Sequence, residues 1–308
     1  MVGCVTEEAA TALGLPIAGV PVFHGCGDAG STTCGVGSGV PGAPYAYMGT
    51  SGWVATTLSR ETAACNKSPG VFLLEHPIDS SLVIVAASIM TAGGSLDFLR
   101  QIMLSRESNP ECHDEEYVQL CTLAAESEPG ARGVLYLPWL AGERSPFLDA
   151  NARGGFLGLS LSTARCDLCR AVLEGVAYSY RALLEAVLPP GDKEQSIGRP
   201  VLALAGGPSK SPLWMQIMAD VLTVRIAVAG EAQHSGARGA ALLAAKGLGW
   251  IDTLAPCGGF FPQAEVYDPN PTVAALHEAR YRIHTSLYPA LKAAFGAMAT
   301  VPALAPLA

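Results

Sequence analysis

The sequence predicts an α/β fold, and three observations support this prediction. Residues from Pro21 to Met90 form short apolar runs that glycine, proline and serine interrupt at short intervals, as in a strand-rich segment. Residues 200–249 follow the order strand, turn, helix, strand, helix, which is typical of α/β domains. Between them lies Cys166–Leu188, whose apolar residues recur at every fourth position, as on one face of a long buried helix.

The elements follow from these patterns in chain order. Thr6 is a suitable N-cap for a first helix, "TEEAATALGL", and five strand-like runs follow it: "VPVFHG", "YAYMG", "GWVATTL", "GVFLLEH" and "SLVIVAASI". Helices are predicted over 93–104 and 114–127, a buried strand over 133–142, and a polar loop over 142–160. After the long helix, the sequence predicts the strands "PVLALAGG" and "VRIAVAG", a small-residue helix "SGARGAALLAAKGLG" that packs tightly, and a C-terminal helix.

Composition excludes several classes of protein. Half of the 308 residues are hydrophobic and only 15% are charged, which is ample for a large buried core. A net charge of −8 argues against nucleic-acid binding, because phosphates need a cationic surface. No apolar stretch approaches the ~20 residues of a membrane span, and no secretory signal is visible, so we expect a cytoplasmic protein.

The cysteines give no positive signal for a metal site. The nine cysteines are predicted to be mostly buried thiols in a reducing compartment. Cys166 and Cys169 form a single C-x-x-C without a second pair or a nearby histidine, so no metal ligand is predicted.

The stretch "GCGDAG" has the spacing G-x-G-x-x-G from Gly25 to Gly30, which raises the question of dinucleotide binding. That fold also needs a helix opened by the last glycine and an acidic residue about 20 positions later. The following "STTCGVGSGVPGAPY" cannot hold a long helix, and the next strand ends without an acid. Asp28 is then the residue of interest: its small neighbours leave room for a substrate, although a turn aspartate bonded to its own backbone stays open.

Two further stretches have features of phosphate or nucleotide sites. "MGTSGW" lies between two strand-like runs, where backbone N–H groups and hydroxyls of a hairpin could hold a phosphate. In "LAGGPSKSPLWMQ" a strand ends in two glycines directly before a helix, which lets a ligand approach the backbone. Taken alone, an ordinary hairpin turn and an ordinary strand–helix connection are also compatible with these stretches.

Six such segments occur in order, and together they resemble the C-terminal domain of the FGGY family of carbohydrate kinases, nearest to its xylulokinase-like members. They are "PVFHGCGDAG", "YMGTSGW", "AGGSLDFLR", "LAGERSPFLDANARGGFLGL", the signature from Gly154 to Glu174, and "AGGPSKSPLWMQIMADVL". The resemblance implies a ribonuclease H-like, actin-like ATPase domain with a mixed sheet flanked by helices. We therefore expect one domain over 1–308, with its core over about 5–250 and a helical extension over 270–295.

The resemblance also implies transfer of the γ-phosphoryl group of ATP, with Mg²⁺, to a sugar hydroxyl, and a pentulose such as xylulose is the expected substrate. Ala29 stands where xylulokinases commonly carry asparagine, so gluconate-type substrates stay open. The implied roles are general base for Asp28 and nucleotide contacts for a second set: Gly49, Thr50 and Ser51 at the phosphates, Gly93 and Asp97 near the ribose or phosphates, and Gly206, Gly207 and Ser211 at the adenosine.

Family members have two domains of this fold, and the first is expected to be absent from this chain. A separate N-terminal kinase domain is therefore an expected partner, and the sequence leaves a homodimer open. The alternative function is a non-catalytic module, either a truncated kinase or one half of a split enzyme. Glu143 and Arg144 are expected to brace the structure rather than to contact substrate.

Overall fold

The structure is a computed structural model that describes residues 1–66, 68–104, 113–188, 201–228, 231, 234–254 and 265–301. Within these residues, seven strands form the central sheet: β3 (Tyr45–Met48), β4 (Gly52–Ser59), β5 (Val71–Glu75), β6 (Leu82–Ile89), β9 (Leu202–Ala205), β10 (Ile226–Val228) and β11 (Glu265–Tyr267).

The sheet is mixed, in the order β11-β10-β9-β3-β4-β6-β5. Strand β9 pairs in parallel with both β3 and β10, whereas the remaining neighbours pair antiparallel. The two faces of the sheet can be followed along β3, because successive side chains of a strand point to opposite sides. Ala46 and Met48 lie in the main core, and Tyr45 and Tyr47 lie on the other face. The predicted mixed sheet is confirmed.

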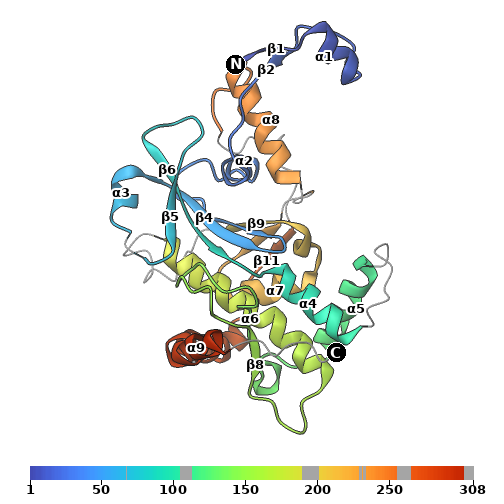
Figure 1. Ribbon diagram of the computed structural model, residues 1–308, viewed down its shortest axis with the longest axis vertical. Coiled ribbons are helices and arrows are strands. Elements are labelled where there is room, and N and C mark those ends of the chain that lie inside the picture. The colour runs from blue at the N-terminus through green and yellow to red at the C-terminus, as the bar shows by residue number, and fades with distance from the viewer. Residues whose placement is uncertain are drawn as a thin grey trace.

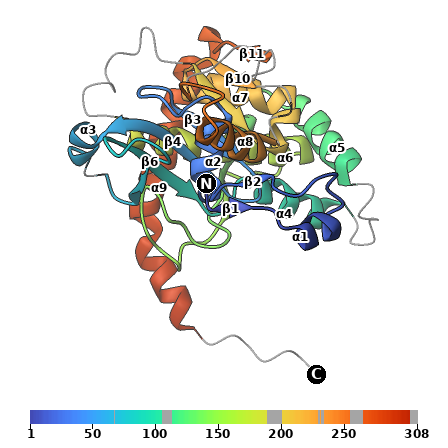
Figure 2. The same cartoon turned by 90° about the horizontal axis from the view of Figure 1, so that it is seen from above.

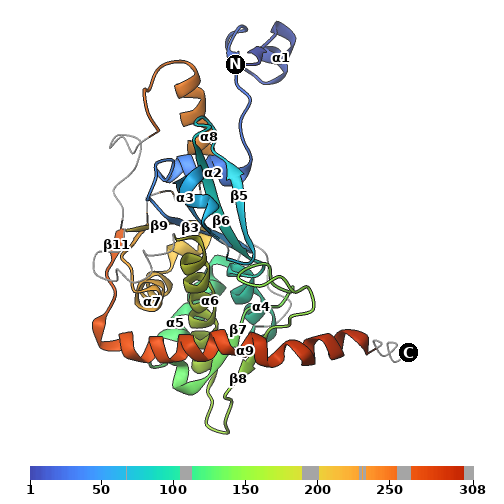
Figure 3. The same cartoon turned by 90° about the vertical axis from the view of Figure 1, so that its left-hand side faces the viewer.

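The main core lies between the sheet and a layer of helices: α4 (Gly93–Met103), α5 (His113–Ala125), α6 (Arg165–Val187) and α7 (Pro212–Leu222) (Figure 1). Helix α6 is buried along almost its whole length, as its continuous apolar pattern predicts. Helix α9 (Ala274–Thr300) crosses this layer on its outer side and extends beyond the rest of the molecule at its C-terminal end (Figures 2 and 3).

The opposite face of the sheet carries α2 (Asp28–Gly35), and α8 (Ser235–Gly247) packs on α2 (Figures 1 and 3). The two helices approach so closely that added methyl groups would overlap backbone atoms. A Cβ on Gly35 would lie 1.8 Å from the carbonyl oxygen of Ser235, and one on Gly239 would lie 1.7 Å from that of Ser31. The predicted tight packing of the small-residue helix is confirmed.

Smaller elements complete the described chain. An N-terminal arm holds β1 (Gly3–Cys4), α1 (Glu7–Ala12) and β2 (Pro21–Val22), and it projects away from the sheet (Figure 3). The others are α3 (Arg60–Ala64), the pair β7 (Leu135–Leu137) and β8 (Gly155–Leu157), and 3₁₀ turns over 131–133, 207–210 and 271–273. No helix among the described residues is long and apolar enough to cross a membrane, and the cytoplasmic location stays a prediction.

The structure agrees with one expectation and corrects two. The stretch after Asp28 forms only a short helix of 8 residues that ends at Gly35, as expected of a sequence that cannot hold a long helix. The strand expected over 133–142 is reduced to β7. Among the described cysteines, Cys34 and Cys169 are buried but Cys4, Cys26 and Cys65 are exposed, so the prediction of mostly buried thiols is wrong for these three.

Candidate active site

The hairpin between β3 and β4 rests on the first turn of α4. The carbonyl oxygen of Gly49 accepts the N–H of Gly93 at 2.8 Å, and that of Thr50 accepts the N–H groups of Ala92 and Gly94 at 2.8 and 3.0 Å. A Cβ on Gly93 would lie 2.7 Å from the Gly49 oxygen, so only glycine permits this approach. Helix α4 therefore fixes the position of the hairpin that the sequence predicts to hold phosphates.

The turn after β9 lies against the end of β3. Gly206 has φ +111° and a Cβ there would lie 2.0 Å from the Met48 oxygen, so glycine is required for two reasons. The Ser209 hydroxyl donates to the Gly206 oxygen at 2.6 Å and holds the turn closed. Gly207 differs, because a Cβ there would meet no atom within 4 Å. Ser211 follows as the N-cap of α7, where its hydroxyl accepts the N–H of Trp214 at 3.3 Å.

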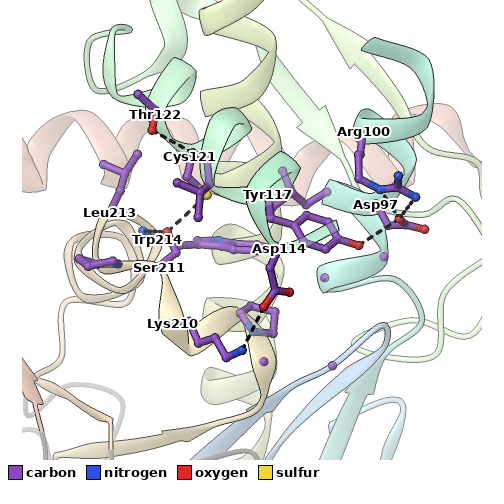
Figure 4. Close-up of a pocket in the computed structure, with 18 of the residues that line it drawn as sticks. Asp97, Arg100, Asp114, Tyr117, Cys121, Thr122, Lys210, Ser211, Leu213 and Trp214 are labelled. Atoms are coloured by element: carbon purple, nitrogen blue, oxygen red, sulfur yellow. Dashed lines mark hydrogen bonds and ion pairs between the residues drawn. The ribbon is translucent and has the colours of Figure 1, made fainter. Parts of the chain in front are cut away.

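A cavity of about 870 Å³ lies between α4, α5 and the segment that joins β9 to α7 (Figure 4). Its walls combine glycine backbone from the hairpin, α4 and the β9 turn with apolar side chains of α4, α5 and α7: Leu96, Tyr117, Val118, Leu213 and Trp214. The floor at Trp214 is fixed, because its indole N–H donates to the Leu173 oxygen at 3.1 Å. A cleft of this size and lining suits a ligand with a flat apolar part and a charged part.

The acidic side chain on the α4 wall is held by its neighbours. Asp97 accepts hydrogen bonds from Arg100 at 2.9 Å and from the Tyr117 hydroxyl at 3.1 Å. Arg100 also donates to Glu116 at 2.8 Å, and this bond raises the pKa of the guanidinium. The network joins α4 to α5 and sets the width of the cavity, and at the mouth Lys210 and Asp114 form an exposed ion pair at 3.5 Å (Figure 4).

Asp28 lies on the other face of the sheet, at the first position of α2. Its Oδ1 accepts the N–H of Ala29 at 2.8 Å, and the side chain is otherwise exposed. The carboxylate is free to meet a substrate, since no other described residue binds it. It therefore combines the two alternatives open from the sequence, a backbone-bonded turn aspartate and an accessible carboxylate.

The structure brings most of the predicted site residues together. One cavity is lined by six of them: Gly49, Thr50, Gly93, Asp97, Gly207 and Ser211. Ser51 belongs to the same hairpin and Gly206 to the same turn, although neither lines the cavity, and Asp28 lies outside it. Sequence reasoning missed Tyr117, which stands in no motif, and Lys210, which lies within "AGGPSKSPLWMQIMADVL" but was given no role. The predicted helix over 114–127 was the available signal for Tyr117.

Glu143 braces the strand end that leads into α4. It is 3% exposed, and its Oε1 accepts the N–H groups of Met90 and Arg144 at 3.0 and 2.9 Å. Burial raises the pKa of this carboxyl to about 7. Its Oε2 has no hydrogen-bond partner among the described residues. These contacts agree with the expected bracing role, because Met90 is three residues from the helix start that supports the hairpin.

A model of the C-terminal domain of the FGGY family of carbohydrate kinases matches residues 45–248. The chain belongs to this family. It is 33% identical over 291 residues to a xylulose kinase of Staphylococcus epidermidis, an alignment that covers 93% of this chain and 54% of that protein. It is 27% identical to a gluconokinase of Bacillus subtilis, over 76% of this chain and 44% of the relative.

Solved structures of sugar kinases superpose on the fold. A ligand-bound xylulose kinase from Lactobacillus acidophilus aligns with a TM-score of 0.81 at 26% identity, over 95% of this chain and 56% of that one. A xylulose kinase from Rhodospirillum rubrum aligns with a TM-score of 0.76 at 31% identity, over 96% and 56%. The predicted ribonuclease H-like, actin-like ATPase fold is thereby confirmed, and the chain spans about half the length of the relatives it matches.

Proposed function

We propose that this chain supplies the nucleotide site and the general base of a sugar kinase, which transfers the γ-phosphoryl group of ATP to a sugar hydroxyl. The cavity of about 870 Å³ between α4, α5 and the β9 turn carries the proposal. The adenosine would lie on the open backbone of Gly207 beside Ser211, and the triphosphate would extend toward the hairpin at Gly49 and Thr50.

Phosphoryl transfer depends mainly on positioning and on stabilisation of charge, so few reactive side chains are needed. Asp28 would accept the proton of the attacking sugar hydroxyl, since its carboxylate is exposed. Ser51 and Gly206 would act from the backbone, by shaping the hairpin and the turn that meets it. Asp97 would set the ribose side of the cavity through the Arg100 network rather than bind a proton in the reaction.

Mg²⁺ would arrive with the nucleotide. No group of three or more His, Cys, Asp or Glu side chains within the described ranges is arranged to hold a metal ion. This fits the usual behaviour of Mg²⁺, which keeps several waters and binds substrate phosphates with only one or two carboxylates.

The expected substrate is a pentulose such as xylulose. The support is that the relative with 33% identity is a xylulose kinase, as are the two structures described above. Gluconate is the competing substrate. A gluconokinase also matches the chain, and Ala29 lacks the side-chain amide of the asparagine that the resemblance to xylulokinases implies beside Asp28.

We further propose that residues 1–308 act as one domain and that a second domain completes the cleft. The relatives are about twice as long as the part that matches, which supports a partner domain in the same polypeptide or in another. We call this chain together with that domain the assembled kinase. The non-catalytic alternative gains no support from the relatives described above, which are named as sugar kinases.

Calorimetry with MgATP tests the nucleotide site on this chain alone. We expect weak but saturable binding that Gly207→Val abolishes, because the new side chain enters the cavity without meeting a protein atom at its Cβ. Gly3→Val is the matched control, since its Cβ is equally open but lies in β1. Equal binding by both variants would contradict the proposed site. ADP release by the assembled kinase, with xylulose and gluconate compared, then identifies the sugar.

A further inference from the structure

Tyr45 is a fully buried side chain that links two parts of the molecule. It lies on β3, on the face of the sheet that α2 covers. Its hydroxyl donates to the carbonyl oxygen of Ala29 at 3.2 Å and accepts the indole N–H of Trp53 at 2.9 Å. Thr33 Oγ1 completes the cluster, 2.8 Å from the Ala29 oxygen and 2.9 Å from the Tyr45 hydroxyl.

The hydrogen bonds connect the first turn of α2, which carries the proposed base, with the β3–β4 hairpin, which carries the proposed phosphate site. A phosphoryl transfer must align these two parts. Ala29 follows Asp28 in the first turn of α2. Trp53 is the second residue of β4, directly after the hairpin at Gly49 and Thr50. Its ring stacks on Tyr47 with centroids 4.2 Å apart and planes at 18° to each other. The indole of β4 is therefore held by two side chains of β3, Tyr45 and Tyr47. The Tyr45 hydroxyl therefore stands between the proposed base and the proposed phosphate site.

The protonation state of Tyr45 suits a permanent donor. Burial raises the pKa of the phenol to about 12, and the hydrogen bonds from Thr33 and Trp53 offset only part of this rise. The hydroxyl therefore keeps its proton through the pH range in which a kinase works, and the bond to Ala29 does not depend on pH.

We propose that Tyr45 is a positioning residue, which holds the first turn of α2 at a fixed place relative to the β3–β4 hairpin through the Trp53–Tyr45–Ala29 hydrogen bonds. This inference rests on the proposed function of Asp28 and of the hairpin. Its physical basis is that a misplacement of about 1 Å between reacting groups can cost on the order of a hundredfold in rate. The side chain never touches the substrate, so its effect belongs to turnover and not to nucleotide binding.

The kinetic test compares three variants of the assembled kinase. Tyr45→Phe removes the hydroxyl and keeps the ring, and Trp53→Phe removes the indole N–H and keeps an aromatic ring on Tyr47. Tyr178→Phe is the matched control, because that hydroxyl is also buried and bonds His277 at 2.9 Å, but from α6 in the main core.

For Tyr45→Phe we expect kcat to fall by roughly ten- to a hundredfold with KM for ATP changed by less than about twofold. A smaller fall in kcat is expected for Trp53→Phe, because the Ala29 bond remains. Tyr178→Phe should keep its kcat even where its stability falls as much. Equal kcat for Tyr45→Phe and Tyr178→Phe would overturn the inference.

A spectroscopic test on the 308-residue chain needs no turnover. In ¹H–¹⁵N spectra, Tyr45→Phe should shift the Trp53 indole signal and the backbone amides of Asp28 and Ala29, and leave those of Gly93 and Gly94 in place. Unmoved Asp28 and Ala29 signals would refute the link whatever the enzyme does. Full activity of an Asp28 variant, by contrast, would refute the proposed base and leave these spectra unchanged, so the two failures are distinguishable.

Discussion

The two faces of the central sheet are built in different ways. The face toward α6 and α7 is filled with large buried side chains, among them Tyr136, Leu173 and Trp214. The face toward α2 has a small apolar cluster, and its outer helices meet through glycine, with Gly35 and Gly239 against backbone atoms. Buried side-chain volume stabilises the first face, whereas on the second face the helices α2 and α8 pack through close approach of their backbones. The difference teaches that the proposed base stands on a helix whose packing against α8 leaves no room for a methyl group at Gly35 or Gly239.

The largest expected effect isolates the chemistry of the second face. Asp28→Asn in the assembled kinase should lower kcat by about 10²- to 10⁴-fold, which is the usual contribution of a general base. The exposed side chain makes one local hydrogen bond, so thermal stability and MgATP affinity should not change. Steady-state kinetics with calorimetry measures both quantities, and near-normal turnover would remove Asp28 from the mechanism.

The next largest effect tests the packing of the first face. Leu173→Ala removes a fully buried side chain from α6, and such deletions cost about 2 to 5 kcal/mol of unfolding free energy. Urea unfolding should show this loss, with MgATP affinity retained below the transition. Leu148→Ala is the control, because Leu148 is 81% exposed. A loss of stability as small as that of the control would mean that the core face does not depend on volume.

Gly239→Ala probes the close approach on the second face. The new Cβ would lie 1.7 Å from the Ser31 oxygen, so α2 and α8 must separate at a cost of about 1 to 3 kcal/mol. Because α2 carries Asp28, kcat should fall more than MgATP affinity does. Gly236→Ala on the same helix is the control, since its Cβ would meet only the hydroxyl oxygen of Thr32, at an ordinary contact distance of 3.7 Å. Equal kcat in both variants would separate helix packing from catalysis.

The same contrast explains what could be predicted from the sequence. Apolar periodicity predicted α6, and small residues predicted the tight packing of α8, because both patterns lie within one short stretch of sequence. The mixed sheet was implied by the family resemblance. The site residues from Gly49 to Ser211 were predicted from motifs that resemble those of the FGGY family, and most of them line one cavity. Tyr45 and Tyr117 were not predicted, because their roles depend on contacts with Ala29 and Asp97, which lie 16 and 20 positions away in sequence.

The smallest expected effect concerns Glu143, which joins the strand end at Met90 to the helix start below the hairpin. Its folded-state pKa of about 7 lies above the ordinary glutamate value of 4.5, so between these values the folded state binds more protons than the unfolded state. The free energy of unfolding should therefore fall as pH rises from about 5 to 7. Glu143→Gln keeps the acceptor for the Met90 N–H and removes the titrating group. The fall in unfolding free energy between pH 5 and 7 should therefore be smaller in the variant, by about 1 to 2 kcal/mol. Denaturation at several pH values measures it, and parallel curves for both proteins would show that the buried carboxyl titrates normally.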